Sequence, residues 1–256
     1  MKVIQVIGFS NTGKTTFVGE LLERLAAVGT VAAVKHLGGH PYALEEGKDT
    51  TLFYEKGAAF SVGIDEEKAV AAIRNPDLEA NLRMLCDAGV DYAVVEGFKQ
   101  HTFASIVIGE LESETCVLRN PSVDEVMASL DQFDDFVTLQ GLVQDLKHSC
   151  DMSRAGALMT FNGIVREWTG ETRTPHLDFD QDFEELLASI RREMEQVPGI
   201  LGVRFHHQKG RLYAGEDITY VAILSERRYE AFSALSNAID RLKRELHDAG
   251  KDIAGV

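Results

Sequence analysis

Cysteine, proline and tryptophan are scarce in this chain of 256 residues, which holds three, five and one of them. The cysteines, Cys86, Cys116 and Cys150, lie far apart in sequence and form no Cys-x-x-Cys pair. This pattern argues against a disulfide framework and is typical of a reducing cytoplasm, where we expect the protein to be found. The low proline content and the 45% of hydrophobic residues favour a globular protein over a disordered or fibrous one.

Basic residues and long apolar segments are also in short supply. Lysine and arginine number 26 against 41 aspartates and glutamates, so the formal net charge is −15. An acidic chain is a poor general binder of nucleic acid, and we expect no such partner. No apolar run approaches the roughly 20 residues of a membrane-spanning helix, so we expect no membrane association. The apolar residues 2–7 run into a glycine-rich turn, which predicts a core strand and not a signal peptide.

Apolar periodicity divides the chain into two expected domains, residues 1–138 and 139–256, with a junction inside residues 132–146. In the first, strand-like runs alternate with helical patterns, which predicts an α/β domain with a mostly parallel sheet and helices on both faces. The runs lie at residues 2–7, 30–34, 59–64, 92–95 and 106–108, and the helical patterns at residues 15–28, 49–56 and 76–86. The second is expected to be a smaller α+β domain, with strands at residues 155–165, 201–208 and 218–224 and helices at residues 181–197 and 229–247.

Residues 8–15, GFSNTGKT, fit the phosphate-binding pattern G-x-x-x-x-G-K-[ST] without a mismatch. In a loop of this kind, successive backbone N–H groups turn inward around a phosphate, and glycines permit the required backbone angles. A strand before the motif and a helix after it are the context of a P-loop NTPase domain. The predicted nucleotide-binding residues are Gly8, Ser10, Asn11, Thr12, Gly13, Lys14, Thr15 and Thr16.

A Mg²⁺ ion is expected beside the phosphates, bound by the hydroxyl of Thr15 and by an acidic group. Glu96 ends the apolar run YAVVE, at the edge of a parallel sheet where ligands bind, and is the first candidate. Asp49 follows the polar loop of residues 37–48 and is the alternative metal ligand. No Asn-Lys-x-Asp segment occurs, so the residues alone leave the identity of the base open.

Four segments of the first domain carry a resemblance to a known family. They are GFSNTGKTT at residues 8–16, VKH at residues 34–36, GKDT at residues 47–50 and VVEGFK at residues 94–99. In this order, over roughly residues 1–130, they resemble the molybdopterin-guanine dinucleotide biosynthesis protein B family. The resemblance implies a GTP-binding, often homodimeric adaptor with weak GTPase activity. It also implies a partner, the enzyme that joins GMP to molybdopterin.

Basic residues of the second domain stand at the ends of its predicted elements. Arg166 follows a strand, Arg227 and Arg228 lie where a strand turns into the last helix, and Lys243 and Lys251 lie towards the end of that helix and beyond it. Spacing alone leaves two interpretations open. The five groups converge on one anionic ligand, or each is an ordinary solvated cation.

The segments around these residues resemble the large catalytic subunit of molybdopterin synthase, from about residue 145 to residue 256. They are ALMTFNGIVR at residues 157–166, HHQKGRLYAGED at residues 206–217, SERRYEAF at residues 225–232 and LK at residues 242–243. The resemblance implies conversion of precursor Z to molybdopterin with a small, thiocarboxylated sulfur-carrier subunit. It implies Lys243, Lys251 and Arg166 as catalytic residues and Arg166, Arg227, Arg228 and Lys243 as substrate-binding residues.

Three features depart from that family. Arg227 stands where the family usually has histidine, and Gly250 stands where it has its second active-site lysine, with Lys251 next to it. The tail after this point is short. The chain ends in Ala-Gly-Val and not in Gly-Gly, so the sulfur carrier is expected to be a separate protein.

The sequence therefore predicts a bifunctional molybdenum cofactor biosynthesis protein, with a sulfurtransferase in its second domain. One alternative is a P-loop GTPase metallochaperone with a non-catalytic C-terminal binding domain, which would bind metal at His36, His40 and His101. Gly38, Gly39 and Pro41 disfavour the helix that would give His36 and His40 ligand geometry. A nucleotide or small-molecule kinase is a further alternative, against which the few arginines of the first domain count.

Overall fold

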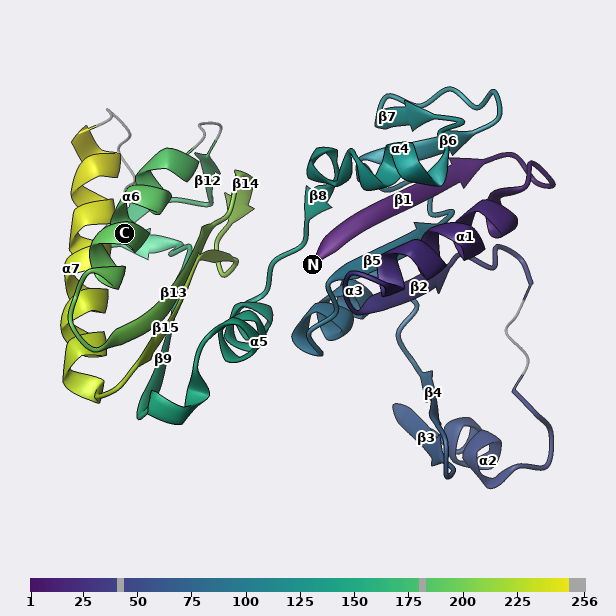
Figure 1. The fold of residues 1–256 in the computed structure, drawn as a ribbon, viewed down its shortest axis with the longest axis horizontal. Coiled ribbons are helices and arrows are strands. Elements are labelled where there is room, and N and C mark those ends of the chain that lie inside the picture. Colours follow the sequence, from purple (N-terminus) through teal and green to yellow (C-terminus); the bar gives the residue numbers. More distant parts are fainter. Residues whose placement is uncertain (41–43, 180–182, 249–256) are drawn as a thin grey trace. The chain divides into compact units, whose positions relative to one another are not determined.

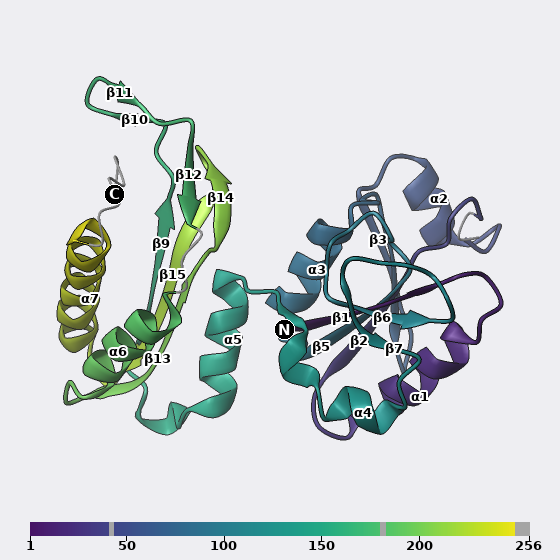
Figure 2. The ribbon, with the colours of Figure 1, turned by 90° about the horizontal axis from the view of Figure 1, so that it is seen from above.

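The computed structural model describes residues 1–40, 44–179 and 183–248, and the chain folds into two compact units. The N-terminal unit comprises residues 1–86 and 90–136, and the C-terminal unit comprises residues 87–89 and 137–256. Both are drawn in Figures 1 and 2. None of the helices in the described part of the chain is both long and apolar enough to cross a membrane.

A six-stranded sheet forms the centre of the N-terminal unit. Its strands are β1 (Lys2–Gly8), β2 (Val31–Lys35), β5 (Tyr92–Glu96), β6 (Ser105–Ile108), β7 (Cys116–Arg119) and the short β8 (Asp134–Asp135). The order β2-β5-β1-β6-β7 is parallel throughout, and β8 pairs antiparallel with β1. The helices of the unit are α1 (Lys14–Ala26), α2 (Asp49–Glu55), α3 (Leu78–Asp87) and α4 (Val123–Met127), with a 3₁₀ turn at Leu130–Gln132.

Helices cover both faces of this sheet because its central strands are apolar on both sides. Ile4 and Val94 pack with α1 and α4, whereas Val3, Ala93 and Val95 pack with α3. Strands buried on both faces are expected for a parallel sheet with crossover helices. The predicted α/β class is confirmed.

Residues 59–64 are an exception to the predicted parallel sheet. They form β3 (Phe60–Ile64), which pairs antiparallel with β4 (Ala69–Ile73) in a separate hairpin beside α2. The prediction that this run joins the alternating parallel strands was wrong. Phe60, Val62 and Ile64 are exposed, so the run is apolar without being a core strand.

The C-terminal unit is built on a three-stranded antiparallel sheet in the order β13-β15-β9. These strands are β9 (Ala157–Ile164), β13 (Ile200–His207) and β15 (Asp217–Ser225). Two smaller pairs join β12 (His176–Phe179) to β14 (Gly210–Tyr213) and β10 (Trp168–Thr169) to β11 (Thr172–Arg173). The helices are α5 (Leu139–Ser149), α6 (Glu184–Glu195) and α7 (Arg228–Asp248), with a 3₁₀ turn at Met152–Arg154.

Strand β15 is buried on both faces and shows how the unit is layered. Val221 and Ile223 pack into the core beneath α6 and α7, whereas Ala222 and Leu224 pack against α5. This is the period of two expected of a strand. Figure 1 shows α6 and α7 on one side of the sheet and α5 on the other. The predicted α+β class is confirmed. Part of the expected junction, residues 132–146, forms the beginning of α5.

Candidate functional site

The glycine-rich loop lies between the end of β1 and the start of α1. A side chain at Gly8 would place its Cβ 2.3 Å from the carbonyl oxygen of Ile108, so the close approach of β6 requires glycine there. Gly13 has a φ of +85° and Asn11 a φ of +62°, in the left-handed region. The backbone thus curls as a phosphate-binding loop does, and α1 starts at Lys14 with its N-terminus at the loop.

Lys14 folds back over the loop that precedes it. Its ammonium donates to the carbonyl oxygen of Phe9 and lies 3.5 Å from the hydroxyl of Thr12. Partial burial lowers the pKa of Lys14, the neighbouring Lys99 and Lys35 act in the same direction, and Glu96 opposes them. A ligand phosphate would give this ammonium the anionic partner that the loop carbonyl does not provide.

Lys35, Glu96 and Thr15 meet at the carboxyl ends of β2 and β5. The strand register pairs Lys35 with Glu96, and Val6 of β1 pairs with Glu96 on the other side. The Thr15 hydroxyl is 3.3 and 3.4 Å from the two Glu96 carboxylate oxygens. The Lys35 ammonium lies 3.0 Å from Glu96 and 3.1 Å from Thr15 Oγ1. A cation therefore already bridges the hydroxyl and the carboxylate.

The Thr15 hydroxyl and the Glu96 carboxylate suit a hard cation such as Mg²⁺. Mg²⁺ takes oxygen ligands at about 2.1 Å in an octahedron, which puts neighbouring oxygens about 3 Å apart. Thr15 and Glu96 present two oxygens at close to that separation. Asp49, the alternative acid, is exposed at the start of α2 and does not line the same cavity.

A cavity of about 660 Å³ opens over this group. Seven of the eight predicted nucleotide-binding residues line it, and Thr12 does not, since its hydroxyl donates to the Phe9 carbonyl within the loop. The sequence prediction missed two cations in the lining, Lys35 and Lys99. Lys35 is the last residue of β2, and Lys99 follows β5. These positions were the available signal, because ligands gather at the carboxyl ends of parallel strands.

The histidines His36, His40 and His101 are the residues of the alternative metal interpretation. His36 and His40 are in the lining, and His36, Phe98, His101 and Phe103 form a series of ring contacts with centroids 4.7, 5.9 and 6.2 Å apart. Within residues 1–40, 44–179 and 183–248, no group of three or more His, Cys, Asp or Glu side chains is arranged to hold a metal ion.

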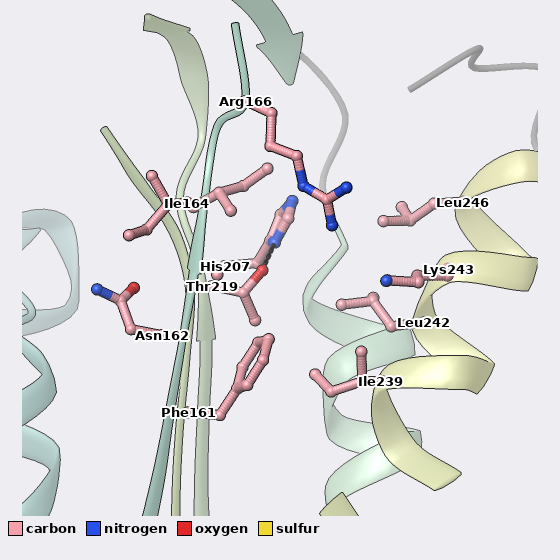
Figure 3. Close-up of a pocket in the computed structure, with 12 residues that line it drawn as sticks. Phe161, Asn162, Ile164, Arg166, His207, Thr219, Ile239, Leu242, Lys243 and Leu246 are labelled. Atoms are coloured by element: carbon pink, nitrogen blue, oxygen red, sulfur yellow. Dashed lines mark hydrogen bonds between the residues drawn. The ribbon is translucent and has the colours of Figure 1, made fainter. Parts of the chain in front are cut away.

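A second cavity, of about 280 Å³, lies between the sheet and α7 in the C-terminal unit. Arg166 reaches it from the segment after β9, and Lys243 reaches it from α7, as Figure 3 shows. The remaining lining is largely apolar, from Phe161, Ile218, Ile239, Leu242 and Leu246. Two cations in an apolar cavity form a site for an anionic ligand with a flat or apolar body.

His207, at the end of β13, is a further polar residue of this cavity. It is 4% exposed, and its Nδ1 lies 2.8 Å from the hydroxyl of Thr219. Its Nε2 is buried without a hydrogen-bond partner in the part of the chain that the structure describes. Burial, and to a lesser extent the neighbouring His206, lower the pKa of His207 to about 4. The imidazole is therefore neutral at pH 7.

Arg227 and Arg228 do not line this cavity. Arg228 is the first residue of α7 and lies 15 residues before Lys243, which corresponds to about 22 Å along a helix. Their predicted role in substrate binding stays a prediction. Lys251 and Gly250 lie outside the described residues.

Two family models match this chain, one in each unit. The family model of Molybdopterin guanine dinucleotide synthesis protein B matches residues 3–132, and that of the MoaE protein matches residues 137–245. A relative from Haloferax volcanii, "Probable molybdopterin synthase", is 31% identical and covers 95% of this chain and 93% of its own length.

Two further relatives each match one unit. "Probable molybdopterin-guanine dinucleotide biosynthesis adapter protein" of Bacillus subtilis is 37% identical over 41% of this chain and 64% of its own length. "Molybdopterin synthase catalytic subunit" of Staphylococcus carnosus is 39% identical over 38% of this chain and 67% of its own length.

Proposed function

Because the chain belongs to the families of Molybdopterin guanine dinucleotide synthesis protein B and of the MoaE protein, joined in one polypeptide, we propose that its units serve two steps of molybdenum cofactor biosynthesis. The C-terminal unit, with a thiocarboxylated sulfur-carrier partner, converts precursor Z to molybdopterin as a sulfurtransferase. The N-terminal unit binds GTP and Mg²⁺, hydrolyses GTP weakly, and assists the enzyme that attaches the guanine nucleotide. We further propose that the chain works as a homodimer.

The observation that supports the synthase activity best is the pair of cations in the C-terminal cavity. Arg166 and Lys243 come from elements far apart in sequence and face the same largely apolar space. A phosphorylated pterin needs cationic donors for its phosphate and apolar surface for its rings. A lysine ammonium among apolar side chains also stabilises negative charge that develops during acyl or sulfur transfer.

Binding of a nucleoside triphosphate is supported by the loop of residues 8–13 and the cations around it. Lys14, Lys35 and Lys99 line the cavity, and the N-terminus of α1 adds its positive end. Thr15 and Glu96 would hold Mg²⁺, which would neutralise phosphate charge when bound. The preference for guanine rests on family membership, and the metallochaperone alternative gains no supporting contact from the described residues.

A reconstituted assay tests the synthase proposal directly. The purified full-length chain, precursor Z and a thiocarboxylated carrier are mixed, and molybdopterin is measured as its fluorescent oxidation product. Formation of product in proportion to the amount of chain is the expected result. No product with an intact fold and a bound carrier would contradict the proposed synthase activity.

Replacing Lys14 with methionine is expected to weaken GTP binding about 30-fold, because a charge-assisted hydrogen bond contributes roughly 2 kcal/mol. The measurement is a titration with a fluorescent GTP analogue. Lys48→Met is the control, since Lys48 is exposed, pairs with Glu45 and does not line the cavity. Equal loss in both variants would mean that only overall charge matters.

Replacing Lys35 with methionine is expected to raise the apparent Mg²⁺ affinity of the GTP complex about tenfold. The Lys35 ammonium contacts both proposed Mg²⁺ ligands, so removing it removes a competing charge. The measurement is a Mg²⁺ titration at fixed GTP analogue. Lys99→Met is the matched control, because it removes a cation that also lines this cavity but follows β5. An unchanged or lower Mg²⁺ affinity in Lys35→Met would refute the competition.

A further inference from the structure

We propose that His207 is a further substrate-contacting residue of the C-terminal cavity, and that its Nε2 atom accepts a hydrogen bond from the bound ligand. The identity of that ligand, precursor Z, rests on the proposed function. The contact itself rests on the burial, packing and surroundings of the imidazole.

The unpartnered nitrogen is the first observation. His207 is 96% buried, yet its Nε2 has no hydrogen-bond partner among the described residues. Buried polar atoms are nearly always paired in native proteins, so an unpaired one requires an explanation. His207 is among the residues that line the cavity, so a ligand bound there is the partner that we assign to this atom.

The ring is held in one orientation, which is what a fixed contact atom needs. Nδ1 lies 2.8 Å from the Thr219 hydroxyl. Phe179 and Phe183 pack edge to face against the imidazole, with ring centroids 4.8 and 5.7 Å away. A side chain fixed by packing and by a hydrogen bond loses little freedom when it binds a ligand.

The surroundings indicate that Nε2 accepts and does not donate. Figure 3 shows Nδ1 directed at Thr219 and the other ring nitrogen on the side of Arg166. The charged groups in the lining, Arg166 and Lys243, are both cations, and no carboxylate belongs to the described part of the cavity wall. Nearby cations favour the tautomer with N–H on Nδ1 and the lone pair on Nε2.

An acceptor at this position completes the set of groups that the cavity offers. Arg166 and Lys243 have only donors. Asn162 is also in the lining, but it points to the other side of the sheet in Figure 3 and donates to Asp217 at 2.7 Å. Nε2 of His207 therefore suits an N–H or O–H group of a ligand whose phosphate is held by the cations.

Three substitutions of His207 separate the contact from the packing. Glutamine keeps an amide near the place of Nε2, asparagine keeps one near the place of Nδ1, and phenylalanine keeps the ring without either nitrogen. We expect His207→Phe and His207→Asn to weaken the binding of precursor Z about tenfold in calorimetry. We expect His207→Gln to bind within about threefold of the wild type.

The wild-type protein provides a readout that needs no variant. With ¹⁵N-labelled histidine, Nε2 of free His207 is expected to give the signal of an unprotonated nitrogen. This signal should shift towards the hydrogen-bonded value when precursor Z is added, while Nδ1 stays protonated. A protonated Nε2, or a signal that precursor Z leaves in place, would overturn the inference.

Arg166→Ala and Lys243→Ala distinguish this failure from failure of the proposed function. If both lose affinity for precursor Z while His207→Phe binds like the wild type, only the role of His207 is refuted. If Arg166→Ala and Lys243→Ala also bind precursor Z like the wild type, or if the wild type does not bind it, precursor Z is not the ligand of this cavity. The proposed function and the role of His207 are then both refuted.

Discussion

Replacing Lys243 with alanine is expected to lower the rate of molybdopterin formation about 100-fold or more. Lys243 faces a cavity whose lining is largely apolar. Among the described residues, no other lysine lines this cavity. Loss of one donor to a developing negative charge typically lowers the rate by two to three orders of magnitude. The measurement is the initial rate of product formation at saturating carrier and precursor Z. The proposed GTP binding by the N-terminal unit is measured beside it and should stay unchanged.

Arg244→Ala is the matched control, because Arg244 is the next residue on α7, is exposed and does not line the cavity. It should retain nearly the full rate. Equal loss in both variants would point to damage of the helix. A rate in Lys243→Ala equal to that of the wild type would refute the assignment of this lysine.

Acidification from pH 7 to pH 4 is expected to lower the free energy of unfolding of the C-terminal unit by about 3 kcal/mol through His207 alone. Burial lowers the pKa of His207 from 6.5 to about 4 in the folded chain. Between these values the unfolded chain binds more protons than the folded one, so stability is complete above pH 6.5 and falls as the pH decreases towards 4. One pKa unit corresponds to about 1.4 kcal/mol.

Urea unfolding at several pH values measures this effect. Methyl NMR signals of Ile190 and Ile223, both buried in the core of the C-terminal unit, report on that unit specifically. His207→Gln has no titrating group at this position, so its stability should fall less steeply across the same interval. If the unfolding free energies of the wild type and of His207→Gln fall in parallel with pH, the imidazole takes up its proton equally in the folded and unfolded chain. That result would refute the prediction.

The strand, loop and helix of residues 2–26 were predictable because several local signals coincide there. An apolar run precedes the loop. Gly8 stands where a side chain would clash, and Gly13 adopts a positive φ. Helix α1 then buries Val18, Leu21 and Leu25 along one face. Lys35 was harder to predict. Its part in the site depends on the pairing of β2 with β5, which brings together residues 61 positions apart.

Helix α5 escaped prediction because residues 132–146 were assigned to the junction between the domains and no helix was predicted there. Thr138 accepts a hydrogen bond from the backbone of Gly141 at 2.9 Å and caps the helix, so a local signal was present. Contact with Ala222 and Leu224 on β15, and with Leu201 on β13, makes this segment part of the C-terminal core.

His207 could not be recognised as a cavity residue from the sequence. His206 and His207 are adjacent, and alternation along a strand places one on each face without saying which face holds the cavity. The structure resolves this through packing. His206 stacks on Tyr220, and His207 packs between Phe179 and Phe183.

The position of α5 decides where the chain can be divided into its two units. A truncated chain that begins after Ser149 would leave Ala222 and Leu224 of β15 uncovered, and such a fragment would expose an apolar sheet face prone to aggregation. A fragment meant to carry the cavity with Lys243 must therefore begin before Thr138, so that the cap and the whole of α5 stay with the sheet they cover.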